Sequence, residues 1–218
     1  MLLGAILLGL DAKSQVDTTS HSAQQSVQLN LGSQGIGAEF LYGLSSRFTL
    51  RAGANIIPVK ANNVFKISDF KSNTEASADF TNIHALADYS PFSDAGAFRF
   101  VAGLAYFLKA EGNIRVTPSD SYSYGDLQLS KEQVGHLDLN VDWKGVAPYF
   151  GIAIGHAFPR KKFNVNLDLG GYYLSAPKAD IKGTGLLSGN DSQTGQFQSN
   201  IKDYRLLPVM QLNFNFKL

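Results

Sequence analysis

The sequence predicts an all-β protein, a single antiparallel transmembrane β-barrel of about eight strands, and three observations lead to this fold class. Apolar and polar residues alternate in segment after segment with a period of two, which is the pattern of a β-strand with one apolar and one polar face. Short and long connections alternate along the chain. The polar faces are rich in Gly, Asn and single charges, which suits a narrow lumen rather than a water-exposed surface.

The composition is that of one domain with few charges. Charged residues make up 17% of the 218 residues, below the roughly 25% of a typical soluble domain. The formal net charge is +1, so we expect no basic surface and no nucleic acid as partner. The chain has no cysteine, which excludes a disulfide framework and thiolate chemistry.

The chain begins with an apolar run, residues 1–10, that is too short to span a bilayer as a helix. Ala12-Lys13-Ser14 before Gln15 offers the small residues of a signal-peptidase site, so we expect residues 1–14 to be an export signal. The basic start of such a signal is missing, and we expect it upstream of Met1; a buried first helix is the alternative. We expect residues 15–26 to be a flexible polar segment and residues 27–218 to form the barrel.

The alternating segments give about seven clear crossings. In chain order they are residues 35–42, 48–56, 82–89, 98–109, 148–155, 163–173 and 204–218. Bacterial single-chain barrels have an even number of strands, so another strand is needed. We expect it between residues 18 and 31, although Leu29 and Leu31 are out of phase with Ile36 across the glycine-rich residues 32–35.

The connections separate into two classes, short turns and long polar loops. The short turns are residues 43–46, 91–96 and 159–162, and the long loops are residues 61–73, 118–135 and 186–200. In outer-membrane barrels short turns face the periplasm and long loops face outward, and the C-terminus here falls on the short-turn side. Several aromatic residues lie toward the long loops, where we expect one interfacial girdle: Tyr106, Trp143, Tyr149, Tyr173 and Tyr204. Four prolines lie near the same end and predict a bulged or frayed outer rim: Pro58, Pro148, Pro177 and Pro208.

The last predicted strand carries a resemblance to known proteins. Its apolar face runs from Tyr204 through every second residue to Phe214, Phe216 and Leu218. This ending resembles the C-terminal strand of bacterial outer-membrane barrels, although the usual last residue there is Phe. The resemblance implies that Phe214, Phe216 and Leu218 form an assembly signal read by the barrel-assembly machinery. It also implies a location in the cell outer membrane, with outer-membrane lipid around the barrel.

Over nearly all of the predicted mature chain the pattern resembles the small OmpA-like, OmpX-like and OmpW-like barrels. Residues 145–152, followed by 168–173 and 175–178, are similar to the Pro-Tyr-x-Gly and Asp-x-Gly strands of the OmpW-like group. Such families imply surface adhesion, envelope stability or passage of small hydrophobic molecules. None of these roles transfers to a particular residue of this chain.

Charged and imidazole side chains on the polar faces predict a network inside the lumen. Its expected members are Glu39, Arg51, His84, Asp88, Arg99, Lys109, Asp168 and Arg205. A conducting path is one interpretation. A packed polar plug is favoured, because an eight-stranded barrel is only wide enough to be filled by its own side chains and unlike charges neutralise each other where an unpaired ion would be costly.

Catalysis and metal binding find little support in the pattern. His84 and Asp88 share one face and are conceivable as a general base with its orienting carboxylate. The nearest upstream hydroxyl, Ser77, would face the opposite side of the strand. We therefore expect no catalytic site, no cofactor and no metal site, although a lipid-modifying hydrolase is a third hypothesis.

The sequence thus predicts a non-enzymatic envelope protein. We expect it to act in envelope structure, in surface interaction through the long loops 118–135 and 186–200, or as a subunit that binds an envelope protein partner. One alternative is an OmpW-like conduit for small hydrophobic molecules. Another is a soluble lipocalin-like binder whose apolar faces are turned inward.

Overall fold

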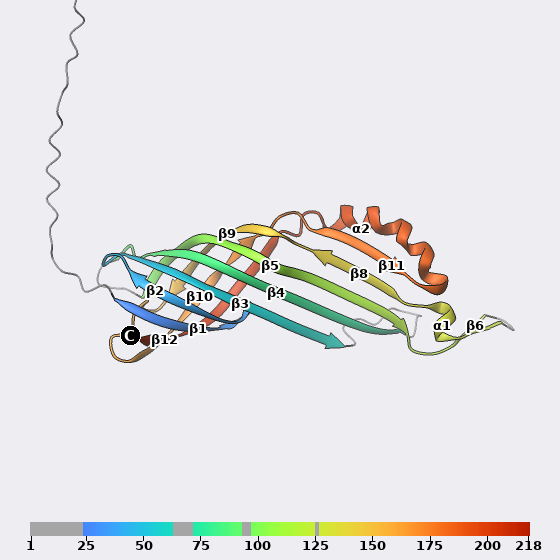
Figure 1. Cartoon of the computed structure of the whole chain (residues 1–218), viewed down its shortest axis with the longest axis horizontal. Helices are drawn as coiled ribbons and strands as arrows, with labels where there is room; N and C mark the ends of the chain where they lie inside the picture. The colour runs from blue at the N-terminus through green and yellow to red at the C-terminus, as the bar shows by residue number, and fades with distance from the viewer. Residues whose placement is uncertain (1–23, 63–71, 93–96, 125–126) are drawn as a thin grey trace, which may run out of the picture.

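The computed structural model describes residues 24–62, 72–92, 97–124 and 127–218, and its eight longest strands close into a ring. They are β1 (Gln25–Gly32), β2 (Gly35–Gly43), β3 (Phe48–Asn62), β4 (Ser72–Tyr89), β5 (Phe98–Pro118), β9 (Gly145–Ile154), β10 (Phe163–Tyr173) and β12 (Leu206–Lys217). Every pairing in the ring is antiparallel, and β1–β12 and β5–β9 complete it (Figure 1). The predicted fold class is confirmed.

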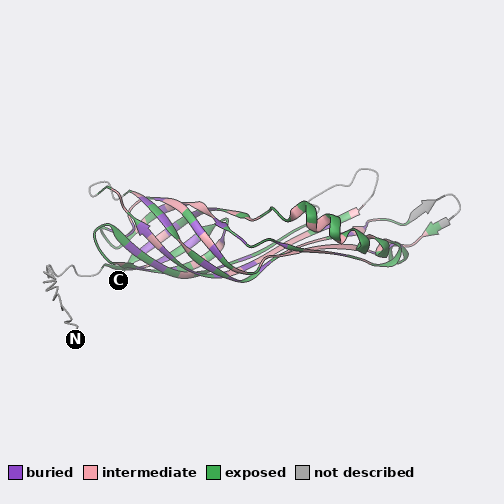
Figure 2. Ribbon diagram, turned by 90° about the horizontal axis from the view of Figure 1, so that it is seen from above, coloured by how far each residue is buried: buried purple, intermediate pink, exposed green. Residues whose placement is uncertain are grey.

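The alternation along the strands places apolar side chains outside the ring and polar side chains inside. Ile36, Phe100 and Phe150 are more than half exposed on the outside, whereas Glu39 and Arg51 are buried in the lumen. Buried and exposed positions alternate along each strand of the ring (Figure 2). This is the orientation of a barrel surrounded by lipid, and the lipocalin-like alternative, which needs the apolar faces inside, is wrong.

The first strand is regular, and the predicted phase problem is resolved by a tight turn. β1 starts at Gln25, within the segment predicted to be flexible, and a two-residue connection leads into β2. Leu31 and Ile36 are therefore direct partners on the same outer face. Gly35 has φ 77°, which a tight turn of this kind requires. This outward connection is short, so short and long connections do not alternate throughout. The predicted export signal, residues 1–14, and most of the flexible segment lie outside the described residues.

Three strands continue beyond the ring and form the core of an outward extension. The parts of β3, β4 and β5 that lie beyond the ring form one sheet with β8 (Leu137–Asp142) and β11 (Lys178–Gly183). The strand order of this sheet is β3-β4-β5-β8-β11. The extension also carries the hairpin of β6 (Tyr122–Tyr124) and β7 (Leu127–Leu129) and three helical segments, α1 (Lys131–Val134), η1 (Gly185–Gln193) and α2 (Thr194–Ile201) (Figure 1). The predicted loops 118–135 and 186–200 are thus largely ordered structure.

The free edge of β11 is covered by side chains from η1 and α2. The amides of three alternate residues point to that edge: Ala179 donates to Gln198 Oε1 (2.7 Å), Ile181 to Thr194 Oγ1 (3.1 Å) and Gly183 to Asp191 Oδ1 (2.7 Å). An open sheet edge is a template for pairing with another chain. The helical segment therefore ends the extension sheet on this side.

The outer rim is irregular at one place and regular at three of the four prolines expected to disturb it. The β4–β5 register shifts between Thr81 and Asn82, which makes a β-bulge in β5. In contrast, continuous pairings of β3, β9 and β12 include Pro58, Pro148 and Pro208. None of the helices in the described part of the chain is long and apolar enough to cross a membrane.

Candidate functional site

An arginine held by three carboxylates lies at the centre of the lumen. Arg51 of β3 contacts Glu39 of β2 (Nε to Oε2, 2.6 Å), Asp168 of β10 (Nη2 to Oδ2, 2.6 Å) and Asp88 of β4 (Nη1 to Oδ1, 3.5 Å). All four side chains are at most 2% exposed. One guanidinium group of β3 therefore connects the two neighbouring strands β2 and β4 with β10 on the opposite side of the ring, a geometry suited to its fork of donors.

His84 and Arg99 complete this cluster of charged groups. His84 Nε2 lies 3.2 Å from Glu39 Oε1, and its Nδ1 lies 3.0 Å from Asn82 Oδ1. Arg99 Nε lies 3.3 Å from Asp88 Oδ2. The suggested pairing of His84 with Asp88 is therefore replaced by contacts of His84 with Glu39 and of Asp88 with the arginines. Both nitrogens of His84 face lumen groups that hold it in place, and no hydroxyl nucleophile is among these contacts.

Six of the eight predicted lumen residues are brought together, and two are not. Lys109 follows the β-bulge in β5, which reverses the sides of the strand, so its Nζ lies outside and contacts Asp79 Oδ2 at 2.6 Å. Arg205 precedes β12 and its Nε donates to the carbonyl of Lys202 (3.3 Å). The assignments of Lys109 and Arg205 to the lumen network are wrong.

The lumen network contains more uncharged Asn and Gln side chains than predicted charged and imidazole side chains. Asn30 Nδ2 donates to Glu39 Oε1 (2.6 Å), and Asn213 Nδ2 donates to Asn166 Oδ1 (2.6 Å). The further buried members are Gln28, Gln34, Asn55 and Gln211. For Asn55 and Asn166 the signal was present in the sequence, because they have the same strand parity as Arg51 and Asp168.

Aromatic rings fill the lumen on the outward side of the polar cluster. Tyr149 and Tyr172 lie 4.8 Å apart between ring centroids, Phe107 lies 5.4 Å from Tyr172, and Phe80 lies 6.3 Å from Phe107. Phe107, Tyr149 and Tyr172 are at most 3% exposed. Tyr149 was predicted to belong to the interfacial girdle, and this is wrong because the side chain points into the barrel.

The two layers together fill the barrel, as expected for eight strands. Charged and amide groups occupy the part near the short turns, and aromatic rings occupy the part below the outward extension. No group of three or more His, Asp or Glu residues in the described ranges is arranged to hold a metal ion. This arrangement fits the predicted packed polar plug, which stays a prediction.

The C-terminal strand presents its apolar side chains outward. Phe216 is 43% exposed and Leu218 68%, and Phe216 lies opposite Val27 and Phe163 in the neighbouring strands. These side chains belong to the band that contacts lipid. The role of Phe214, Phe216 and Leu218 as an assembly signal stays a prediction.

The extension has two chemically different faces. On its outer face Arg115 makes two hydrogen bonds to Asp138, 2.7 and 2.8 Å, and Asn113 donates to Asn140 at 2.7 Å. The hydrogen bonds from Arg115 hold the pKa of Asp138 below its ordinary value. The opposite face, which continues the lumen side of β3, β4 and β5, carries apolar residues and a groove described below.

Solved structures of outer-membrane proteins are similar to this chain. It is similar to the crystal structure of Acinetobacter baumannii CarO, with 18% identity and a TM-score of 0.64 over 88% of this chain and 97% of that one. It is likewise similar to CarO2 of the same organism, with 18% identity and a TM-score of 0.65 over 89% and 98%. A major outer membrane protein from Thermus thermophilus aligns with 9% identity and a TM-score of 0.50 over 91% and 100%. The chain therefore has the fold of an outer-membrane β-barrel, and these neighbours support the predicted location in the cell outer membrane.

The sequence comparisons add no family. No family model matches the chain. Among curated proteins, the large ribosomal subunit protein uL22 of Methanoculleus marisnigri is 29% identical over 132 residues, which is 55% of this chain and 86% of that protein. A net charge of +1 offers no basic surface of the kind that binds RNA phosphates, so this similarity carries no functional argument.

Proposed function

We propose that this protein is a non-enzymatic outer-membrane β-barrel with a closed lumen, which acts through its outward extension. The observation that carries this proposal is the combination of a filled barrel with a five-stranded extension whose β11 edge is capped by α2 and η1. A filled barrel leaves no aqueous path for solutes, whereas an ordered extension presents a fixed surface to the outside. Outer-membrane lipid around the barrel and an envelope protein at the extension are the partners that fit this arrangement.

The orientation in the membrane provides one test. The chain has no cysteine, so a single introduced cysteine is the only site for a maleimide. Glu132→Cys lies in α1 of the extension and Arg160→Cys in the short turn between β9 and β10. A membrane-impermeant maleimide should label Glu132→Cys on intact cells and Arg160→Cys only after the outer membrane is opened. Labelling in the reverse order would contradict an outward extension.

The closed lumen provides the second test. Purified protein in a planar lipid bilayer should show no stepwise ion conductance, because Arg51 and the aromatic rings occupy the lumen. Stable conductance steps from the wild-type protein, absent from a heat-unfolded sample, would contradict the proposal.

A conduit for small hydrophobic molecules is the second candidate, and the apolar groove beside the barrel mouth favours it. Such a solute would have to pass between Phe107, Tyr149 and Tyr172 and then through the charged cluster around Arg51. If the lumen conducts hydrophobic molecules, Tyr172→Ala should raise their uptake into cells. If the lumen is only a plug, uptake should be independent of the wild-type protein.

A further inference from the structure

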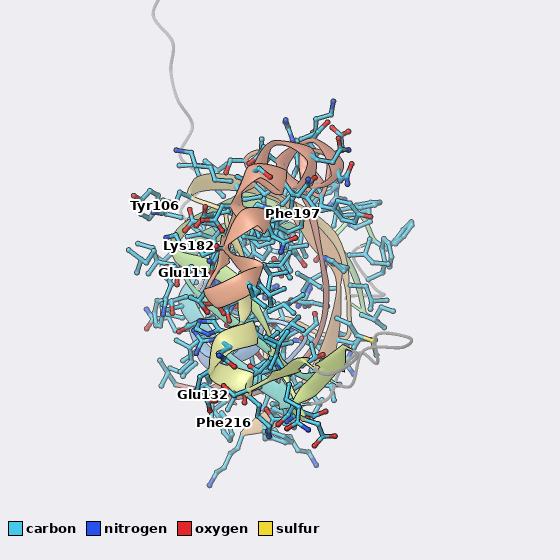
Figure 3. All side chains as sticks on the ribbon, turned by 90° about the vertical axis from the view of Figure 1, so that its right-hand side faces the viewer. Tyr106, Glu111, Glu132, Lys182, Phe197 and Phe216 are labelled. Carbon is cyan, nitrogen blue, oxygen red and sulfur yellow. The ribbon has the colours of Figure 1, made fainter. Side chains whose placement is uncertain are left out.

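A groove lies on the apolar face of the extension. Its wall is made by side chains that continue the lumen-facing alternation of β3, β4, β5 and β8, chiefly Val59, Ala76, Ala78, Ile114, Leu139 and Val141. Trp143, which follows β8, and Phe197 of α2 complete the lining, and the volume is about 340 Å³. Figure 3 looks onto the extension from its outer end, with Phe197 on α2 and Glu111 on β5 labelled.

Small residues create the hollow. Ala61, Ala76, Ala78 and Gly112 occupy neighbouring positions in three adjacent strands, whereas Phe80 lies one position nearer the barrel on the same face. A Cβ atom added at Gly112 would meet no heavy atom within 4 Å. The space over this residue is open, and it can be filled by a larger side chain without moving the backbone.

The lining disfavours a charged ligand and an extended peptide. No lysine, arginine, aspartate or glutamate is among its described residues, and the ion pairs of the extension, such as Arg115 with Asp138, lie on the other face. The backbone groups of the wall are paired in the β3–β4, β4–β5 and β5–β8 ladders. An extended peptide would leave its own N–H and C=O groups unsatisfied against this wall, which is costly. The volume lies at the low end of the roughly 300–1,000 Å³ of small-molecule sites.

The position of the groove indicates where its occupant comes from. The face that bears the groove continues the lumen side of the strands, so it faces away from the lipid-contacting surface. A lipid chain from the bilayer would have to cross the polar outer face or the strand edges to reach it. A solute from the surrounding water can enter through the open side, where a polar head group can also stay hydrated.

We propose that this groove binds the hydrocarbon chain of a single-chain amphiphile taken from the external water. The chain contacts Val59, Ile114, Leu139 and Val141, and the rings of Trp143 and Phe197 lie against it. Burial of apolar surface supplies the affinity. This binding site goes beyond the proposed function and does not depend on it.

Trp143 makes the proposal directly measurable, because it is the chain's one tryptophan. Its Nε1 donates to the carbonyl of Tyr204 (3.0 Å) and its ring centroid lies 5.9 Å from that of Phe80, so its position in the groove is fixed. The protein is placed in phosphatidylcholine nanodiscs, which avoids detergent as a competing amphiphile. Bromododecanoate is then added, and quenching of tryptophan fluorescence by its bromine is recorded. Saturable quenching is expected for the wild-type protein.

Matched variants test whether the quenching comes from bromododecanoate bound in the groove. Gly112→Phe and the smaller Gly112→Leu fill the groove and should abolish saturable quenching. Glu111→Phe adds the same bulk to the adjacent residue, whose side chain is 52% exposed on the other face, and should leave quenching unchanged. Each variant is first checked for the folded band by gel mobility without boiling.

Two outcomes would overturn the proposal. The first is quenching that is equally strong in the wild-type protein and in both folded Gly112 variants, because the bromine would then reach Trp143 without the groove. The second is quenching of Trp143 by brominated phospholipid in the nanodisc with no amphiphile added, because the groove would then take a membrane lipid. A closed or a conducting lumen changes neither result, so failure here is distinguishable from failure of the proposed function.

Discussion

Replacing Arg51 by Met should strongly destabilise the barrel. Arg51 contacts Glu39 and Asp168 at 2.6 Å each and Asp88 at 3.5 Å, with every partner at most 2% exposed. Methionine keeps much of the side-chain volume but removes the charge, so three carboxylates remain buried near one another. Removal of one partner from a buried ion pair costs about 3–5 kcal/mol. Asp168 is the most affected carboxylate, since its Oδ1 has no hydrogen-bond partner among the described residues and its Oδ2 accepts from Arg51.

The assay is a urea titration of the folded band on an unboiled gel, with the free energy of unfolding taken from linear extrapolation. Arg51→Met should lower this free energy by about 3–5 kcal/mol at neutral pH. The double variant Arg51→Met with Asp168→Asn should recover part of the loss, because it removes one of the uncompensated carboxylates. Arg115→Met is the matched control; its bridge to Asp138 is 48% exposed on the arginine side, and its loss should cost about 0–1 kcal/mol.

One result would refute this account of the lumen. If Arg51→Met unfolds within about 1 kcal/mol of the wild-type protein, the cluster contributes no more than an exposed pair. The carboxylates would then be solvated or protonated in the folded barrel, and the polar layer could not be called a packed plug.

Three further predictions concern the extension and the first turn. Because hydrogen bonds from Arg115 hold the pKa of Asp138 below its ordinary value, this bridge stabilises the extension above the ordinary carboxyl pKa and its contribution is lost as the pH falls through the lowered one; the hydrogen-exchange protection factors of β8, which are corrected for the intrinsic exchange rate at each pH, should fall on acidification in the wild-type protein and less in Asp138→Asn. Gln198→Ala uncaps an edge amide of β11 and should increase self-association in light scattering, whereas Gln196→Ala on the same helix should not. Gly35→Ala, with φ 77° and a Cβ that would overlap the carbonyl oxygen of Ile56, should lower the free energy of unfolding in the urea titration by at least about 1 kcal/mol.

The ring of strands could be predicted because each strand has a different environment on each side. Lipid outside and a polar lumen inside impose a period of two, and this pattern gave seven crossings directly from the residues. The first strand was harder to place, because the apparent phase error between Leu31 and Ile36 disappears only when the connection is a two-residue turn. Glycines at both ends of that connection were a usable signal for such a turn.

Lys109 shows what the sequence could not reveal. In a regular strand Lys109 would share the face of Arg99, but one extra residue in β5 opposite Thr81 and Asn82 reverses the sides beyond it. No residue type in β5 marks this bulge. The lysine is instead placed by its ion pair with Asp79, a residue of the neighbouring strand.

The extension was missed for a different reason. Residues 137–142 do alternate, with Leu137, Leu139 and Val141 on one side. A strand of six residues gains little stability from its own sequence alone. β8 is held in place because it pairs with β5 on one side and with β11 on the other. The helices η1 and α2 carry few apolar residues, and their place is set by hydrogen bonds to the edge of β11.

The lumen and the groove are parts of one continuous surface whose chemistry changes along the strands. On β4 the inward side chains pass from Asp88 and His84, through Phe80, to Ala78 and Ala76 of the groove wall. An apolar molecule in the groove is in a favourable environment. A step toward the periplasm would bring it among buried charged groups that are stabilised by their contacts with one another. Its free energy would rise there because it would separate Arg51 from its carboxylates without replacing their contacts. In the proposed closed barrel the residues that exclude ions also oppose passage of a hydrophobic solute, so a molecule bound in the groove would be retained on the outer side.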